Sequence, residues 1–190
     1  MSRLEQILAH NDAFVDNHNY EEFRTTKFPD KKLAVVTCMD ARLTELLPKA
    51  LNLRNGDAKI IKNAGAIVTQ PFGNIMRSIL VAVYELGAEE VLIIGHYECG
   101  MTGLNPESVL GKVKDVGIQE DVIHTLVHSG INLKRWLTGF DNVKESVENS
   151  VSIVRNHPLL PPNTPVHGLI IHPETGKLDL IVNGYEKHQR

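Results

Sequence analysis

The chain has 190 residues, of which 42% are hydrophobic and 23% charged, a composition typical of a globular protein that can bury one sizeable core. A net charge of −3 and an aromatic content of only 5% argue against binding to nucleic acid or to an anionic membrane. The first residues lack the apolar segment of a secretory signal, and no apolar run reaches the length of a membrane span. We therefore expect a cytoplasmic protein that forms a single domain over residues 1–190.

The N-terminal region predicts a helix that needs a surface to cover. Apolar side chains recur at helical spacing over residues 4–16, opposite a polar face, and Ser2 is placed to cap this helix. The segment that follows, up to residue 30, is polar and irregular. Residues 1–30 are thus interpreted as a helical arm, whose helix covers either its own domain or a second subunit.

Strands and helices alternate after the arm. The first strand is continuously apolar, which is typical of a strand buried on both faces of a sheet. Pro48 is expected to interrupt the first helix, and Gly87 to end the second. This alternation predicts an α/β fold with a parallel sheet. The expected strands are 33–37, 58–62 and 91–94, and the expected helices are 43–53 and 75–86.

The C-terminal half predicts helices followed by a hairpin. Residues 101–157 are mostly helical in character, with 118–128 and 142–155 as the clearer helices. Residues 166–172 and 177–182 flank a short loop with a glycine and predict two antiparallel strands.

Both cysteines of the chain, together with one histidine, lie where expected strands end. Cys38 follows the first strand, and His96 and Cys99 follow the third. Two thiolates and an imidazole are preferred ligands of zinc, and three protein ligands leave a fourth position open for chemistry. Two simpler interpretations are a single disulfide, which is uncommon in a reducing cytoplasm, and inert buried cysteines. The coincidence of all three residues at two strand ends favours the zinc site.

Spacing argues against other cysteine chemistries. The interval from Cys38 to Arg42 is too short for the phosphate-binding loop of a cysteine phosphatase. The sequence has no C-x-x-C pair for thioredoxin-like redox chemistry or a four-thiolate zinc site. It also has no glycine-rich phosphate loop between a strand and a helix, so a nucleotide site is not supported.

A shared metal ion would constrain the order of the strands. If Cys38 and His96 bind the same ion, the strands that precede them must be neighbours, which leaves the second strand outside the first. The resulting order, 2-1-3, places a switch point at the carboxyl ends of strands one and three, where open α/β sheets bind ligands. The expected fold is therefore an α/β protein with a parallel-core sheet of strand order 2-1-3, a C-terminal hairpin, flanking helices and a projecting N-terminal helix.

Asp40 and Arg42 follow Cys38 by two and four residues. Two thiolates cancel the charge of zinc, so the site acidifies a bound water less than three neutral histidines would. A carboxylate that accepts a hydrogen bond from hydroxide, and is itself held by an arginine, would favour hydroxide near neutral pH. Two alternatives stay open: Asp40 closes the site as a fourth ligand, or the pair is a surface ion pair unrelated to the metal. Backbone N–H groups around Ala64 and Gly65 are candidates for supporting the developing anion.

Three segments of the sequence resemble the signature segments of the β-class carbonic anhydrases. They are Cys38-Met-Asp-Ala-Arg42, Lys62-Asn-Ala-Gly65 and Gly95-His-Tyr-Glu-Cys-Gly100, and the similarity extends from about residue 30 to the final hairpin.

The resemblance implies one Zn²⁺ per subunit on Cys38, His96 and Cys99, and the reversible hydration of carbon dioxide to bicarbonate and a proton. Zinc-bound hydroxide would be the nucleophile. Asp40 and Arg42 would form a catalytic dyad, with Asp40 as the fourth ligand of a closed state. Family members are homodimers or larger homo-oligomers in which the N-terminal helix packs on the partner subunit.

Some features of the sequence leave the substrate open. Plant-like members of the family carry a glutamine in the substrate pocket where this chain has Pro29, although the shorter variety that this chain resembles more closely also lacks it. Relatives of the same architecture hydrolyse carbonyl sulfide or carbon disulfide, which is an alternative activity here. A zinc-binding regulatory protein with weak catalysis is another alternative. Glu98 has no assigned role beyond a polar contact near the rim of the site.

Overall fold

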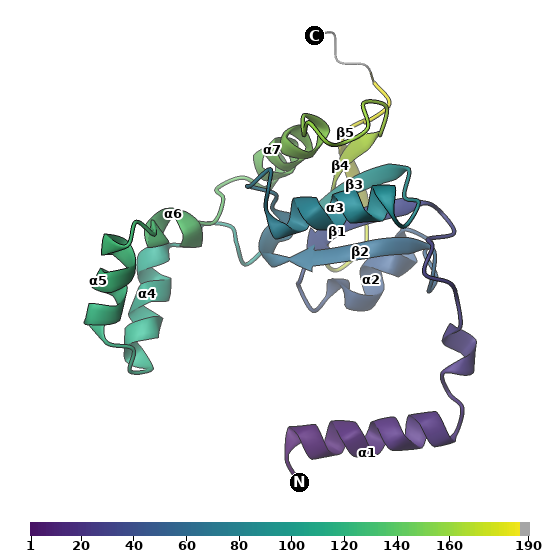
Figure 1. Ribbon diagram of the computed structural model, residues 1–190, viewed down its shortest axis with the longest axis horizontal. Coiled ribbons are helices and arrows are strands. Elements are labelled where there is room, and N and C mark those ends of the chain that lie inside the picture. The colour runs from purple at the N-terminus through teal and green to yellow at the C-terminus, as the bar shows by residue number, and fades with distance from the viewer. Residues whose placement is uncertain (187–190) are drawn as a thin grey trace.

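The computed structural model describes residues 1–186 and contains, within them, one five-stranded sheet in the order β2-β1-β3-β4-β5 (Figure 1). The pairs β1–β2, β1–β3 and β3–β4 are parallel, and β4–β5 is antiparallel. The strands are β1 (Leu33–Cys38), β2 (Ala58–Asn63), β3 (Glu90–His96), β4 (Val166–Ile171) and β5 (Leu178–Val182).

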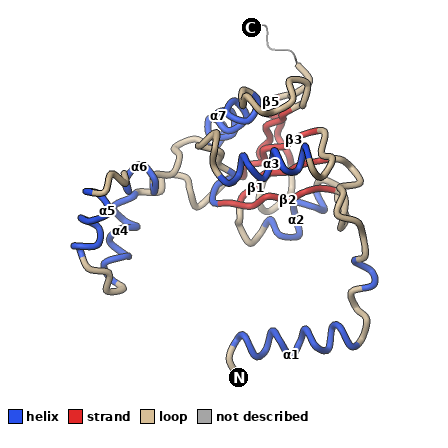
Figure 2. The backbone as a smooth tube through the Cα atoms, in the orientation of Figure 1, coloured by secondary structure: helices blue, strands red, loops and turns tan. Residues whose placement is uncertain are grey.

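Helices cover both faces of this sheet, and others project from it (Figure 2). The helices are α1 (Arg3–Asp16), α2 (Leu43–Ala50), α3 (Asn74–Tyr84), α4 (Pro106–Asp115), α5 (Glu120–His128), α6 (Leu133–Leu137) and α7 (Val143–Arg155). Short 3₁₀ turns lie at Glu21–Phe23 and Ala64–Ala66. No helix within residues 1–186 is long and apolar enough to cross a lipid bilayer.

The central strands are buried on both faces because their alternate side chains enter two separate apolar clusters. Ala34 and Val36 of β1 lie in the cluster that includes residues of α3 and α7. Val35, between them, lies in the cluster that includes Leu43 and Leu47 of α2. Since successive side chains of a strand point to opposite faces, α3 and α7 cover one face and α2 covers the other.

Glycines let α7 approach the sheet closely. A Cβ atom on Gly95 of β3 would lie 2.8 Å from a methyl group of Val147, and one on Gly168 of β4 would lie 2.8 Å from another methyl group of the same residue. Because Gly95 directly precedes His96, this packing holds the end of β3, where His96 lies.

Two parts of the chain stand away from the sheet (Figure 1). Helix α1 has a Ser2 capping box, but it buries none of its residues, and Leu4, Ile7 and Leu8 are more than half exposed. The lobe formed by α4, α5 and α6 buries Leu133 alone among its helical residues. Its exposed apolar side chains include Trp136, which is 72% exposed.

The predicted α/β fold, the strand order 2-1-3, the C-terminal hairpin and the projecting N-terminal helix are confirmed. The predicted interruption of α2 at Pro48 is wrong, since the helix continues to Ala50. Proline has a helical φ and removes one hydrogen-bond donor, and burial of Leu43 and Leu47 holds the helix against the core despite that loss. The third strand is longer than expected and ends on His96 itself.

Candidate metal centre

Cys38, His96 and Cys99 converge at the carboxyl ends of β1 and β3. Their ligand atoms all lie within 4.8 Å of one another, and the three residues are at most 5% exposed. Cys38 and His96 are the last residues of their strands, and Cys99 follows β3 after a two-residue turn. The hydroxyl of Thr37 donates a hydrogen bond to the carbonyl of Ile94 at 3.1 Å, which ties the two strands together beside the site.

The two cysteines are free thiols, with their sulfur atoms 3.8 Å apart. That separation is far longer than the ~2.05 Å of a disulfide bond. It does suit two sulfur ligands of one tetrahedral metal ion, each about 2.3 Å from the ion. The disulfide alternative therefore has no support in the structure.

The donor set fits a metal ion, because one nitrogen of the His96 ring has a hydrogen-bond partner and the other has none. Its Nδ1 lies 2.8 Å from the carbonyl oxygen of Tyr97, so Nδ1 carries the proton and donates it. Its Nε2 is buried and has no hydrogen-bond partner within the described part of the chain. A buried nitrogen that lacks a partner is costly, and a metal ion held with the two sulfurs would satisfy it.

The two thiols differ in acidity. Burial raises the pKa of Cys38, but the His96 ring and the Gly65 N–H, 3.3 Å from the sulfur, outweigh burial and lower this pKa to about 7. Burial raises the pKa of Cys99 to about 11, because its backbone contact with Met101 is too weak to offset burial and the neighbouring Cys38. Burial also acts to lower the pKa of His96, yet the contact with Cys38 leaves this pKa above its ordinary value.

Asp40 lies beside the three converging residues and is held by Arg42. Its Oδ2 is 3.8 Å from Nε2 of His96. Oδ1 accepts hydrogen bonds from the Arg42 backbone N–H at 2.9 Å and from Nε at 3.1 Å, and Oδ2 accepts one from Nη2 at 3.0 Å. These contacts lower the pKa of Asp40 to about 2 and raise the pKa of Arg42. The pair is therefore next to the converging ligands, and is not a surface ion pair remote from them.

Glu98 is a site residue whose contacts the sequence did not reveal. Its Oε2 lies 3.3 Å from Nη1 of Arg42, and its backbone carbonyl accepts a hydrogen bond from Nη2 at 3.3 Å. Glu98 has a φ of 56°, which is uncommon for a residue with a side chain. Its place between His96 and Cys99 was visible in the sequence, but a contact across 56 residues depends on the neighbouring strands.

Of the two N–H groups expected to support a developing anion, that of Gly65 is engaged elsewhere, so the expectation is wrong for Gly65 and stays a prediction for Ala64. The Gly65 N–H group already donates to the sulfur of Cys38. Gly65 has a φ of 78°, and this left-handed conformation turns the peptide toward the sulfur. The Lys62-Asn-Ala-Gly65 segment therefore provides a hydrogen-bond donor to the Cys38 sulfur.

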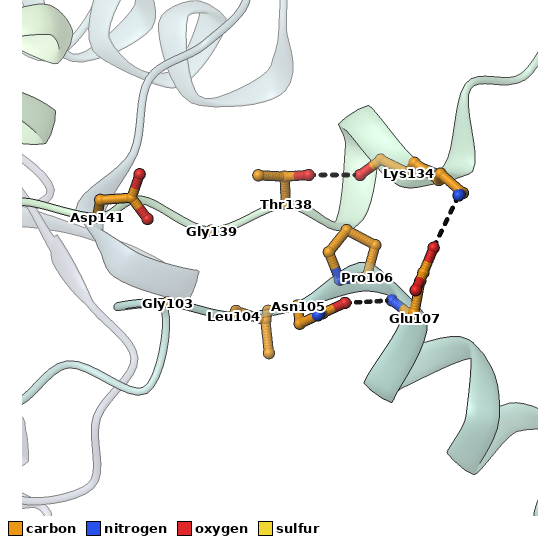
Figure 3. A pocket seen from close by; sticks show the side chains of 9 residues that line it. All are labelled: Gly103, Leu104, Asn105, Pro106, Glu107, Lys134, Thr138, Gly139 and Asp141. Atoms are coloured by element: carbon orange, nitrogen blue, oxygen red, sulfur yellow. Dashed lines mark hydrogen bonds and ion pairs between the residues drawn. The ribbon is translucent and has the colours of Figure 1, made fainter.

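A cavity of about 500 Å³ lies where the α4–α6 lobe joins the sheet, and it contains none of the residues above. In Figure 3, Lys134 points toward Glu107, and the two form an ion pair at 2.8 Å. The residues that line this cavity include neither a cysteine nor a histidine, so it lacks the donor set found at Cys38 and His96. Its lining residues are Gly103, Leu104, Asn105, Pro106, Glu107, Lys134, Thr138, Gly139 and Asp141.

Comparison with known proteins agrees with this geometry. A family model described as "Carbonic anhydrase" matches residues 33–178. The chain is 62% identical to "Putative carbonic anhydrase YvdA" of Bacillus subtilis over 186 residues, which cover 98% of this chain and 94% of that protein. It is also 32% identical to a carbon disulfide hydrolase of Acidithiobacillus thiooxidans, over 78% of this chain and 76% of that protein.

A solved structure shows that the similarity extends to the fold. The crystal structure of β-carbonic anhydrase isoform I from Trichomonas vaginalis superimposes with a TM-score of 0.88 at 39% identity, covering 97% of this chain and 100% of that one. The family model spans both strand ends and extends through β4, and the chain accordingly belongs to the β-carbonic anhydrase family.

Proposed function

We propose that this protein catalyses the zinc-dependent, reversible hydration of carbon dioxide to bicarbonate and a proton. The observation that carries the proposal is the placement of the Asp40 carboxylate 3.8 Å from the unpartnered Nε2 of His96, beside two buried thiols. Family membership makes the same reaction the first expectation.

Cys38, His96 and Cys99 would hold the ion, with Nε2 as the histidine donor. Zinc bound there would supply the Lewis acidity that activates water for addition to the carbon of carbon dioxide. The two sulfurs and the neutral imidazole would also balance its charge, so the polarity near the open position depends on Asp40.

Asp40 would orient the attacking water and accept its hydrogen bond. With a pKa of about 2, this carboxylate is ionised at neutral pH and can only accept. Arg42 holds both of its oxygens and thereby fixes the direction of the remaining lone pairs. Addition of water to carbon dioxide yields bicarbonate and releases one proton, which must leave to solvent or buffer before the next cycle. In an open form of the site Asp40 would keep its hydrogen bonds to Arg42, whereas in a closed form it would leave Arg42 and become the fourth ligand.

Stopped-flow hydration with a pH indicator, combined with zinc analysis of the purified protein, tests this proposal. We expect about one zinc per chain and a turnover that Asp40→Ala lowers by at least about 100-fold. Full turnover without zinc, or unchanged turnover in the variant, would overturn it.

Carbon disulfide hydrolysis is a second candidate, because one relative at 32% identity is named for that activity. Carbonyl sulfide is a related linear substrate. Initial rates on carbon dioxide, carbonyl sulfide and carbon disulfide separate the candidates, and we expect carbon dioxide to be the preferred substrate. A zinc protein with negligible rates on all three would instead support a regulatory role.

We further propose that residues 1–190 form one domain with an N-terminal arm, and that the protein is a homodimer or larger homo-oligomer. Helix α1 buries nothing within its own chain, although it has a stripe of exposed apolar side chains that includes Leu4, Ile7 and Leu8. Such a stripe is expected to be covered in an assembly, and a second copy of the chain is the proposed partner.

A further inference from the structure

The peptide that follows His96 orients its ring. Nδ1 donates to the carbonyl oxygen of Tyr97 at 2.8 Å, and this contact fixes the ring tautomer that leaves Nε2 free for a metal. The position of the Tyr97 peptide therefore sets the direction in which Nε2 points.

Tyr97 is anchored to the C-terminal hairpin at two points. Its N–H donates to the carbonyl of Ile171 at the end of β4, at 3.2 Å. Its hydroxyl donates to Oδ2 of Asp179 on β5 at 2.8 Å, and the other carboxylate oxygen of Asp179 lies 3.2 Å from Nζ of Lys177.

The charge states suit this arrangement. The Tyr97 hydroxyl is the donor and the Asp179 carboxylate the acceptor, and the Lys177 ammonium lies beside the same carboxylate. A neutral phenol thus donates to an ionised carboxylate, which is a strong type of hydrogen bond.

From these contacts we infer that Tyr97 and Asp179 are positioning residues that hold the His96 ring in its metal-binding orientation. The inference rests on the proposed zinc site, and it gives the C-terminal hairpin a role in metal binding. Outer partners of a histidine ligand commonly change metal affinity by about 10- to 100-fold when removed. Tyr97 acts through its own peptide, so we expect an effect near the lower end of that range.

The same sheet provides a matched control. Tyr185 donates a hydrogen bond to Oε1 of Glu90 at 2.7 Å, and Glu90 is the first residue of β3 whereas His96 is the last. Tyr185→Phe therefore removes a tyrosine–carboxylate bond of similar length at the opposite end of the strand.

The test measures zinc affinity of the full-length protein by competition with a chromophoric chelator, together with the visible spectrum of the cobalt-substituted protein. Tyr97→Phe and Asp179→Ala should each weaken zinc binding by about tenfold and alter the cobalt bands. Asp179→Asn, which keeps an oxygen acceptor, should recover most of the affinity, and Tyr185→Phe should match the wild type.

Urea unfolding of the metal-free proteins shows whether Tyr97→Phe and Tyr185→Phe lose comparable stability. If they do, weaker zinc binding in Tyr97→Phe alone cannot be explained by a general loss of structure. Wild-type affinity and an unchanged cobalt spectrum in Tyr97→Phe would overturn the inference while leaving the proposed function intact. A wild-type protein that binds no zinc would overturn both.

Discussion

Arg42 contacts Glu98 through two separate nitrogens, Nη1 to the carboxylate and Nη2 to the backbone carbonyl, each at 3.3 Å. The same guanidinium holds both oxygens of Asp40. Arg42 therefore joins the loop after β1 to the turn after β3, and these are the two segments that carry the proposed zinc ligands. Through Arg42, the orientation of Asp40 depends on Glu98, which follows β3.

Glu98→Ala should lower kcat by about two- to fivefold and leave KM nearly unchanged, because the Glu98 and Arg42 side chains are 64% and 40% exposed and exposed ion pairs contribute little. Glu98→Gln keeps an acceptor for Nη1 and should remain near the wild type. Stopped-flow hydration measures both, with Glu45→Ala, which removes an exposed pair with Lys49 on α2, as the control. Equal rates for Glu98→Ala and Glu45→Ala would contradict the prediction.

Arg42→Lys should have a larger effect than Glu98→Ala. A lysine ammonium cannot hold both oxygens of Asp40 in the planar fork that the guanidinium provides. We expect kcat to fall by about tenfold or more, with zinc content unchanged, because Arg42 is not a proposed ligand. The measurement is a steady-state rate on protein whose zinc content has been checked, and a lysine variant with wild-type kcat would exclude the orienting role of Arg42.

Zinc affinity should rise steeply with pH. In the metal-free protein the pKa of Cys99 is about 11, so a proton occupies this thiol near neutral pH, and the raised pKa of His96 adds to the competition from protons as the pH falls. Zinc requires both thiolates and the neutral imidazole, so its binding releases protons, and a fall in pH favours the metal-free state. Each unit of decrease from pH 8 to pH 6 should weaken binding by at least about tenfold. Chelator competition at several pH values checks this slope, and a flat profile would contradict it.

Gly95→Ala should destabilise the protein, whereas Gly100→Ala should not. A Cβ at Gly95 would lie 2.8 Å from Val147 and 3.0 Å from Val143 of α7, while one at Gly100 meets nothing within 4 Å. Overpacking of this kind costs about 1–3 kcal/mol, and a change at an open position should stay within about 0.5 kcal/mol. Urea unfolding of the two variants under the same metal loading measures the difference, and equal midpoints would show that α7 can shift without cost.

Charges placed on the apolar stripe of α1 should dissociate the proposed assembly. Ile7 and Leu8 are 64% and 53% exposed, so Ile7→Glu/Leu8→Glu should not disturb the fold of the single chain. Light scattering should then report a smaller species than the wild type. Gln6→Glu/Ala9→Glu adds the same charge to the opposite face of the helix and should retain the wild-type mass. Identical masses for both variants would argue against α1 as the contact.

The site could be located from the sequence because its residues fall where apolar strands end. On that basis the sequence predicts that Cys38, His96 and Cys99 lie together, and the requirement that they share one ion predicts that β1 and β3 are neighbours, as the structure shows for the strands and the three side chains. The continuous apolar runs made the strands recognisable, since a strand buried on both faces has no polar alternation. The end of helix α2 is harder to predict from the sequence. Pro48 argues for an interruption, but burial of Leu43 and Leu47 keeps the helix intact to Ala50.

The sequence by itself determined which residues can bind a metal and which strands must lie side by side, because residue type and hydrophobic periodicity are local properties. The tertiary structure alone decided what those residues contact. The hydrogen bond from the Gly65 N–H to Cys38, the contact of Glu98 with Arg42 and the bond from Tyr97 to Asp179 join residues 27, 56 and 82 positions apart. Contacts over such separations depend on strand register and on the conformation of each turn, and these are fixed only when the whole sheet packs against its helices.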